Sequence, residues 1–250
     1  MLQVMIIGSV REHHAKVSST NSVAAAILGT EKPAEGTLIT AAFQEKGRGQ
    51  TGNTWESEAG KNLLMSIILY PAKVRAEDQF IISQMVSLAV YDLVSRETPG
   101  AKIKWPNDIY VKDDKIAGIL IENSVMGNSI TSTVAGIGLN VNQEKFTGNA
   151  PNPVSLTNIT GKSYDIEDVM NGLITLLEER YSMIIRDERE QLYNDYHRAL
   201  YRRAEWHRYK DFNGEFTGII EKVGSGGILA IRSENGVLKE YAFKEIEYLL

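Results

Sequence analysis

Glycines and cationic side chains gather in one short stretch, Gln44 to Trp55. Its three glycines lie within six positions and cannot build a core, because glycine has no side chain to bury. They do let backbone N–H groups approach a ligand closely and point at an anion, and Lys46 and Arg48 add positive charge. The stretch therefore predicts a loop that binds a phosphate or a carboxylate.

The common nucleotide-binding motifs do not fit this loop. A dinucleotide fingerprint opens a helix directly, whereas Gly52 is followed by polar residues and then by an apolar, strand-like run. A kinase glycine-rich loop requires His-Arg-Asp and Asp-Phe-Gly sequences downstream, and neither occurs. A sequence like the end of a P-loop, at residues 161–163, has Leu156 where the first glycine is required. The loop must therefore be interpreted together with its neighbours.

A second group of chemically capable residues surrounds Pro106. Proline cannot donate to a strand ladder and disfavours helix at the residue before it, so two short strands should meet here. Lys104, Asn107 and Asp108 then place a cation, an amide and a carboxylate in one corner. Such a set can contact a phosphate, a base or ribose, and Mg²⁺. The alternative is that Asn107 and Asp108 only form a polar turn.

Three further segments carry candidate site residues. Lys115 begins an apolar strand and is followed by Gly118, whose lack of a side chain allows a ligand near the backbone. Residues 136–142 alternate small and apolar side chains, as expected where a ligand or another backbone lies across a strand. Residues 18–21 precede an alanine-rich helix, and their hydroxyl and amide groups can cap it or bind a polar head group. Both interpretations stay open.

These residues need a framework of strands and helices. Apolar runs predict strands at residues 3–10, 38–43, 62–70, 115–122 and 129–142, and helical spacing predicts helices at 22–29, 80–98 and 165–203. The charged positions at 178–180 and 186–190 are interpreted as a solvated face. After Trp206 the chain changes to short strands, with the hairpin signal Asn235-Gly236 between two of them. This small β module is expected to dock on the larger domain.

Composition narrows the class of protein. The 250 residues include no cysteine, which excludes disulfides, cysteine–zinc sites and a thiol nucleophile. The net charge of −5 argues against a general nucleic-acid binder, although a local basic pocket is still compatible with it. No apolar stretch approaches the roughly 18 residues of a membrane span, and the N-terminus lacks the features of a signal peptide. We therefore expect a cytoplasmic protein.

The ordered set of motifs resembles the biotin protein ligase family, the biotin–[acetyl-CoA-carboxylase] ligases, over nearly the whole chain. The resemblance implies an α+β fold of the class II aminoacyl-tRNA synthetase-like kind, with a mixed, largely antiparallel central sheet flanked by helices and a small C-terminal SH3-like β-barrel. It implies a catalytic biotin/ATP-binding domain at 1–207 and an SH3-like domain at 208–250. The motifs that carry it are residues 19–21, Gln44, residues 47–55, 104–108, 115–122 and 136–140.

The resemblance also assigns roles to these positions. The catalytic residues would be Lys115, Arg48 and Lys104, and Asp108 would bind Mg²⁺. The nucleotide would contact Trp55, Asn107, Gly138 and Asn140. The biotin site would comprise Ser19, Thr20, Asn21, Gln44, Gly47, Arg48, Gly49, Gln50, Lys115 and Gly118.

The implied reaction suits these residue types. ATP activates the biotin carboxylate as biotinyl-5′-AMP, and a lysine of a biotin carboxyl carrier domain then takes the biotinyl group. Two anions must meet, so cations are needed to offset repulsion and to stabilise developing charge. No enzyme nucleophile is required, which agrees with the absence of cysteine. Closure of the glycine-rich loop would exclude water from the intermediate.

Two departures from the family pattern lead to further expectations. Many relatives carry arginine where this chain has Gln50, Thr51 and Asn53, so we expect it to retain biotinyl-AMP less tightly. The release rate of biotinyl-AMP tests this, and a rate as slow as in those relatives would count against it. The chain also begins at the catalytic domain's first strand, without the winged-helix domain of the repressor forms, so we expect no DNA binding.

Two other functions remain as alternatives. A lipoate–protein ligase shares the acyl-adenylating chemistry, but the corner around Pro106 and the C-terminal module favour biotin. A non-catalytic biotin-sensing module would keep the pocket without the reaction, and the presence of Lys104, Asp108 and Lys115 argues against it. The partners expected are biotin, ATP and the carrier domain of a biotin-dependent carboxylase, with no membrane and no nucleic acid. The chain is expected to be a monomer or a homodimer.

Overall fold

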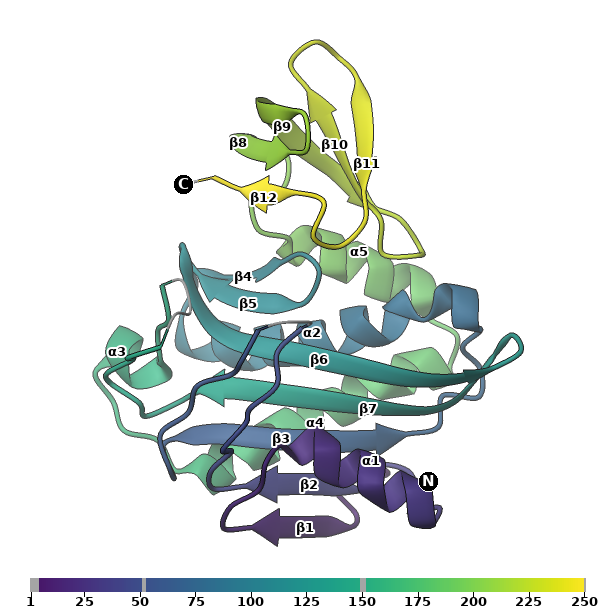
Figure 1. Ribbon diagram of the computed structural model, residues 1–250, viewed down its shortest axis with the longest axis vertical. Helices are drawn as coiled ribbons and strands as arrows, with labels where there is room; N and C mark the ends of the chain where they lie inside the picture. The colour runs from purple at the N-terminus through teal and green to yellow at the C-terminus, as the bar shows by residue number, and fades with distance from the viewer. Residues whose placement is uncertain (1–4, 51–52, 149–151, 250) are drawn as a thin grey trace.

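The computed structural model describes residues 5–50, 53–148 and 152–249 of the chain. Its central sheet has the strand order β1-β2-β3-β7-β6-β5-β4 (Figure 1). Strands β1 and β2 run parallel, and the other neighbouring pairs run antiparallel. The mixed, largely antiparallel sheet that was predicted is therefore confirmed. Its strands are β1 (Arg11–His14), β2 (Leu38–Ala41), β3 (Asn62–Leu69), β4 (Ala101–Lys104), β5 (Asp108–Val111), β6 (Asp114–Met126) and β7 (Ser129–Asn140).

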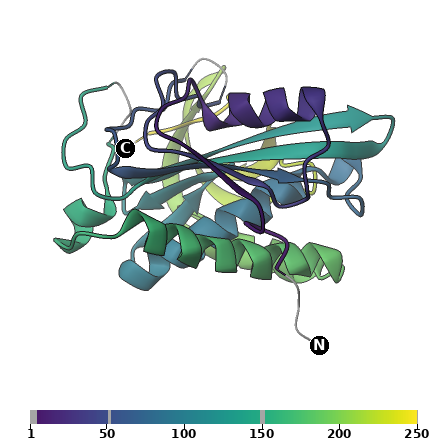
Figure 2. The ribbon, with the colours of Figure 1, turned by 90° about the horizontal axis from the view of Figure 1, so that it is seen from below.

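Helices cover both faces of this sheet (Figure 2). Helix α1 packs on β2, β3 and β7 from one side, while α2 and α4 pack on the sheet from the other and α5 packs on them. Strand β3 is buried along its whole length because it is covered on both faces. The helices are α1 (Thr20–Thr30), the 3₁₀ turn η1 (Ala76–Asp78), α2 (Phe80–Glu97), α3 (Leu156–Thr160), α4 (Ile166–Ile185) and α5 (Arg189–Ala199).

The sheet face under α1 carries two different surfaces. A small apolar cluster of Ala24, Ile39, Ile68 and Val134 holds α1 in place. Side chains alternate between the faces of a strand, so Ser66 and Gly136, two positions away from Ile68 and Val134, lie on the same face. The register pairs Gly136 with Ser66 and with Leu120, and pairs Gly138 with Gly118. Beyond the apolar cluster, this face of the sheet therefore carries glycines in place of larger side chains.

The predicted bend at Pro106 is present as the β4–β5 hairpin. The Trp105–Pro106 peptide bond is cis, and the register sets Lys104 directly opposite Asp108. A second tight turn, with Lys112 at φ 56°, leads into β6. The two turns bring the cation and the carboxylate of this corner beside the start of β6.

The last strands form a separate antiparallel sheet of order β11-β10-β9-β8-β12. It docks on the larger domain as predicted: Trp105 Nε1 donates to the Gly227 carbonyl at 2.9 Å, and the Val223 N–H donates to His197 Nε2 at 2.8 Å. The proposed domain boundary at 207/208 stays a prediction, and the first strand of this sheet begins at Trp206. Its strands are β8 (Trp206–Asp211), β9 (Gly214–Val223), β10 (Leu229–Ser233), β11 (Leu238–Tyr241) and β12 (Glu247–Tyr248).

The strand predicted at residues 3–10 is wrong over its described part, 5–10. These residues form turns, with Gly8 at φ 78°, and the first strand is β1 instead. The N–H groups of Ile6 and Ile7 donate to the Glu178 carboxylate at 3.0 and 2.8 Å, so they are satisfied without a strand partner. Residues 3 and 4 lie outside the described residues. Of the apolar residues at 5–10 only Ile7 is fully buried, whereas Met5 and Val10 are exposed, so the apolar run does not mark a buried strand.

The helical segment predicted at 165–203 is interrupted. Residues 186–188 separate α4 from α5, with Asp187 at φ 63°, and the short helix α3 was not predicted. The solvated face assigned to residues 178–180 is wrong for Arg180, whose side chain is only 17% exposed and pairs with Asp92 and Asp195, whereas Glu179 is exposed as predicted. None of the helices within the described residues is both long and apolar enough to cross a membrane.

Candidate active site

A pocket of about 480 Å³ lies over the part of the sheet that carries Gly118, Gly136 and Gly138. It is bounded by the start of α1, the glycine-rich loop, the β4–β5 hairpin and the C-terminal sheet. Most of the residues predicted to form the site line it. They are Ser19, Thr20, Asn21, Gln44, Arg48, Gly49, Gln50, Trp55, Lys104, Asp108, Lys115, Gly118 and Gly138.

A buried polar cluster forms one end of the pocket, at the N-terminus of α1. Ser19 is the N-cap residue but its side chain makes no capping hydrogen bond, so capping does not explain these polar residues. Gln44 Oε1 accepts from the Thr20 N–H at 2.8 Å and from its hydroxyl at 3.1 Å. Ser66 donates to Asn21 Oδ1 at 2.6 Å, and its oxygen lies 2.7 Å from that of Thr20. The cluster is pre-organised and has donors left over for a polar ligand.

In the middle of the pocket, the Trp55 ring packs against two glycines. A Cβ on Gly138 would lie 2.5 Å from Cε2 of the indole, and a Cβ on Gly118 would lie 2.9 Å from its Cζ3. Glycine is therefore needed here so that the ring can lie on the sheet. The indole Nε1 is buried without a hydrogen-bond partner among the described residues. The close approach that the sequence predicted at these glycines is made, in this structure, by an aromatic side chain.

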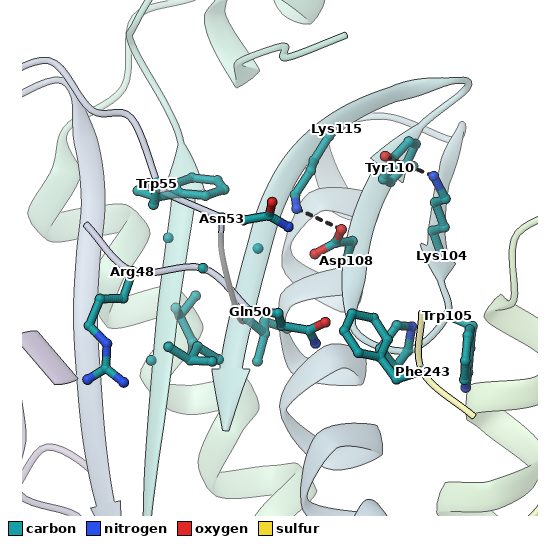
Figure 3. Close-up of a pocket in the computed structure, with 18 of the residues that line it drawn as sticks. Arg48, Gln50, Asn53, Trp55, Lys104, Trp105, Asp108, Tyr110, Lys115 and Phe243 are labelled. Atoms are coloured by element: carbon teal, nitrogen blue, oxygen red, sulfur yellow. Dashed lines mark hydrogen bonds and ion pairs between the residues drawn. The ribbon is translucent and has the colours of Figure 1, made fainter. Parts of the chain in front are cut away.

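Lys104, Lys115 and the Asp108 carboxylate lie at the other end of the pocket (Figure 3). Lys115 Nζ lies 2.6 Å from Asp108 Oδ2 and 5.9 Å from the Trp55 ring. Lys104 Nζ donates to the Tyr110 hydroxyl at 3.2 Å and lies 4.7 Å from that ring. Burial lowers the pKa of Lys104 from its ordinary value, and the attraction of Asp108 opposes this change. This end of the pocket is suited to an anion with several charges.

Arg48 is placed differently from the lysines. Its guanidinium pairs with Glu122, and Figure 3 shows it pointing away from Lys115 and Asp108. The flanks of the glycine-rich loop fold back on each other, with the Trp55 N–H donating to the Gly47 carbonyl and the Gly49 N–H to the Asn53 carbonyl, each at 2.9 Å. Thr51 and Gly52 lie outside the described residues.

Three predicted site residues, Gly47, Asn107 and Asn140, are absent from the pocket lining and support it instead. A Cβ on Gly47 would lie 2.3 Å from the Trp55 carbonyl oxygen. Asn107 donates to the Ile119 carbonyl at 3.0 Å and accepts from Gln50 Nε2 at 2.8 Å. Asn140 donates to the Val154 carbonyl at 3.0 Å. Their direct contact with a nucleotide stays a prediction.

The sequence did not reveal several residues of the site. Ser66 lies on a strand that was interpreted only as core, and Glu122 ends a motif in which it was given no role. Their signal in the sequence was a polar side chain on a strand whose neighbours are apolar. Tyr110, Arg202 and Tyr248 line the pocket from the β4–β5 hairpin, from the connection after α5 and from β12. The Tyr248 ring lies 5.1 Å from Lys104 Nζ. The C-terminal sheet therefore closes one side of the pocket.

Glu56 ties the residues after Trp55 to the segment at 143–148. Its carboxylate accepts from the Thr147 N–H at 2.9 Å, from the Thr147 hydroxyl at 3.0 Å and from the Gly148 N–H at 2.7 Å. Gln143 Oε1 accepts from the Glu58 N–H at 2.9 Å in the same region. Two segments that flank the pocket are thus joined by one carboxylate.

This junction should depend on pH. The hydrogen bond from the Thr147 backbone is the main cause that lowers the pKa of Glu56 below its ordinary 4.5. The folded pKa is the lower one, so the stabilisation is present above pH 4.5 and is lost as the pH falls through the folded pKa. We expect faster amide exchange of Thr147 and Gly148 over that range, measured relative to β7. In Glu56→Gln this pH dependence should be absent, and its persistence would contradict the assignment.

Comparison with known proteins was made at the level of sequence and of fold. Residues 14–142 match the Biotin/lipoate A/B protein ligase family. The chain is 30% identical to the biotin–[acetyl-CoA-carboxylase] ligase of Mycobacterium tuberculosis, over 73% of this chain and 67% of that one. It is 28% identical to the bifunctional ligase/repressor BirA of Bacillus subtilis, over 96% of this chain and 75% of the relative.

A similar solved structure is the biotin protein ligase of Aquifex aeolicus in complex with biotin and ATP. The TM-score is 0.79 at 25% identity, and the match covers 96% of this chain and 98% of that one. The match includes both the central sheet and the C-terminal sheet, since it spans nearly all of each chain.

Proposed function

The chain belongs to the biotin/lipoate A/B protein ligase family, and from this premise we propose how its pocket performs ATP-dependent ligation of biotin. It is a biotin–[acetyl-CoA-carboxylase] ligase: it activates biotin with ATP and transfers the biotinyl group to a carboxylase. The named relatives and the structure with biotin and ATP favour biotin over lipoate as the acid. A non-catalytic sensing role is not supported by these relatives.

The reaction joins two acids in the first step. An oxygen of the biotin carboxylate attacks the α-phosphorus of ATP, the bond to the bridging oxygen breaks, and pyrophosphate leaves. In the second step a lysine amine of the acceptor attacks the acyl carbon, AMP leaves, and the amine gives up a proton. The first step needs the two anions to be held together, and both steps need water to be kept away from the reacting groups.

We assign the polar cluster at the start of α1 to biotin. Its members Thr20, Asn21 and Gln44 are held by one another and by Ser66, so their donors and acceptors are fixed before binding. A pre-organised polar cluster suits the uncharged polar head of biotin, which offers both N–H and C=O groups. The biotin carboxylate would then extend along the sheet toward Lys115.

The opposite end of the pocket is assigned to ATP. Lys104 and Lys115 supply positive charge there, and the Trp55 ring beside Gly118 and Gly138 offers an aromatic surface to adenine. Lys115 Nζ lies 2.6 Å from Asp108 Oδ2 and 5.9 Å from the Trp55 ring, so it would face the biotin carboxylate as well as the α-phosphate. There it would stabilise the negative charge that develops in the transition state. This position of Lys115, between the Asp108 carboxylate and the Trp55 ring, is the observation that carries the proposal.

Mg²⁺ fits the donor set at this end of the pocket. Proteins commonly hold Mg²⁺ through one or two carboxylates together with substrate phosphates, and Asp108 lies in the pocket beside both lysines. No cluster of three or more metal-binding side chains occurs among the described residues, which agrees with a metal held mainly by ATP. When bound, Mg²⁺ would offset the charge of the polyphosphate.

The acceptor is proposed to be the biotin carboxyl carrier domain of a biotin-dependent carboxylase. We further propose that the protein acts in the cytoplasm, binds neither DNA nor a membrane, and works as a monomer or a homodimer. The direct test combines the full chain with ATP, Mg²⁺, biotin and a purified carrier domain, followed by mass spectrometry of the carrier. Addition of one biotinyl group at the carrier lysine is expected. An unmodified carrier, with biotin-dependent pyrophosphate exchange intact, would refute the acceptor but not the first step.

A further inference from the structure

The charge of Arg48 is already engaged within the chain. Its Nη2 pairs with Oε1 of Glu122, and the guanidinium points away from Lys115 and Asp108 (Figure 3). Both partners are partly exposed, with 44% of the Arg48 side chain and 36% of the Glu122 side chain accessible. One nitrogen of the guanidinium is therefore already paired with a carboxylate before any substrate binds.

Glu122 contacts both the glycine-rich loop, through Arg48, and the polar cluster at the start of α1, through Asn21. It lies on β6 opposite Val134 of β7, on the sheet face that carries α1. Its second oxygen, Oε2, accepts from Asn21 Nδ2 at 2.8 Å. Asn21 is fixed from its other side by Ser66, so its NH₂ group is directed at Glu122. One carboxylate thus bridges the cation of the glycine-rich loop and the polar cluster assigned to biotin.

We propose that Glu122 is a positioning residue that competes for Arg48 with the carboxylate of biotin and with the phosphate of biotinyl-AMP, and so sets how tightly both are retained. The inference rests on the proposed function of the pocket. Glu122 and biotin present the same chemical group, and a guanidinium that pairs with one carboxylate has fewer donors for another. Partly exposed ion pairs contribute little to stability, so the exchange of one carboxylate for another is inexpensive.

The variant Glu122→Gln tests the competition. Glutamine keeps an oxygen that can accept from Asn21 Nδ2 but no longer carries the charge that holds Arg48. Biotinyl-AMP release from the full chain, measured by stopped-flow after loading with synthetic biotinyl-AMP, is expected to slow by about two- to fivefold, the range of an exposed ion pair. The KM for biotin should fall by a similar factor, while the melting temperature stays unchanged.

A matched control is available in the C-terminal sheet. Arg232 and Glu221 form an ion pair of nearly equal exposure, 41% and 33%, and neither lines the pocket. Glu221→Gln makes the same chemical change and should leave biotinyl-AMP release unaltered. The double variant Arg48→Ala/Glu122→Gln should release biotinyl-AMP as fast as Arg48→Ala alone, because Glu122 acts through Arg48.

The outcomes separate the inference from the proposed function. Unchanged or faster release from Glu122→Gln would overturn the competition. Slower release from the double variant than from Arg48→Ala alone would also overturn it. The effect would then come from the lost negative charge near the pocket and would not act through Arg48. Biotin-dependent pyrophosphate exchange by the unaltered chain is measured alongside. If that exchange and biotinyl-AMP binding are both absent, the proposed function fails and the competition fails with it.

Discussion

Replacing Lys115 with alanine is expected to lower the rate of biotin-dependent pyrophosphate exchange by about 10²- to 10³-fold, the usual loss when a positioned donor to developing negative charge is removed. Lys115 Nζ lies at the cationic end of the pocket, 2.6 Å from Asp108 Oδ2 and 5.9 Å from the Trp55 ring. Its charge would be felt most where the carboxylate and the α-phosphate approach. The loss should therefore appear mainly in kcat, with a smaller change in the KM for biotin.

A matched lysine provides the control for this experiment. Lys102 lies on β4 and is exposed, and it does not line the pocket. Lys102→Ala should retain the exchange rate, and both variants should melt close to the unaltered chain. Near-normal exchange by Lys115→Ala would remove Lys115 from the mechanism. A loss of similar size in Lys102→Ala would show that general charge, rather than position, is responsible.

Gly138→Ala is expected to have the second largest effect. The new Cβ would lie 2.5 Å from Trp55 Cε2 and 2.7 Å from its Nε1, so the indole must move off the sheet. Forcing a side chain from a packed position typically costs about 1–3 kcal/mol. If the ring is the surface for adenine, the KM for ATP should rise about tenfold or more, whereas the KM for biotin should change little. Steady-state exchange kinetics at varied ATP measure this directly.

Gly29→Ala is the matched control for this substitution. Gly29 lies near the end of α1, and a Cβ there would meet no atom within 4 Å. It should leave both KM values unchanged and could raise the melting temperature slightly, because alanine favours helix. An unaltered KM for ATP in Gly138→Ala would contradict the role of Trp55. A rise in the KM for biotin alone would instead indicate that biotin, rather than adenine, contacts the Trp55 ring.

Local signals predicted the parts of the fold that local chemistry controls. Strand β3 follows from an apolar run, β7 from alternating small and apolar residues, and helix α2 from apolar residues at helical spacing. The bend at Pro106 follows from the conformational limits of proline. The bend at Pro106 also predicted that Lys104 and Asp108 lie in one corner, and the register places them directly opposite each other. Gly118 was interpreted as leaving room for a ligand near the backbone, whereas in the structure the Trp55 ring lies against it.

Contacts between distant segments could not be predicted in this way. Ser66 looked like one polar residue in an apolar strand, and its partners Thr20 and Asn21 lie more than 40 positions away. Arg180 appeared solvated because its partners Asp92 and Asp195 belong to other helices. The apolar run before Gly8 looked like a strand because a hydrophobic pattern does not show which hydrogen-bond partner is within reach.

The loop residues that replace arginine have a partial explanation. Gln50 donates to Asn107 at 2.8 Å and thereby joins the glycine-rich loop to the β4–β5 hairpin. An amide in this place supports the loop but carries no charge to hold the intermediate. The expectation of faster biotinyl-AMP release than in arginine-rich relatives therefore stays a prediction, and the competition by Glu122 for Arg48 would act in the same direction.

The central claim is that Lys115 holds two mutually repelling acids while they join. It is tested most directly by a crystal structure of this chain with biotinyl-AMP bound. The account predicts the mixed anhydride within hydrogen-bonding distance of Lys115 Nζ, about 3 Å, with the biotin head against Thr20 and Asn21. An anhydride bound out of reach of Lys115, or a biotin head at the opposite end of the pocket, would contradict it.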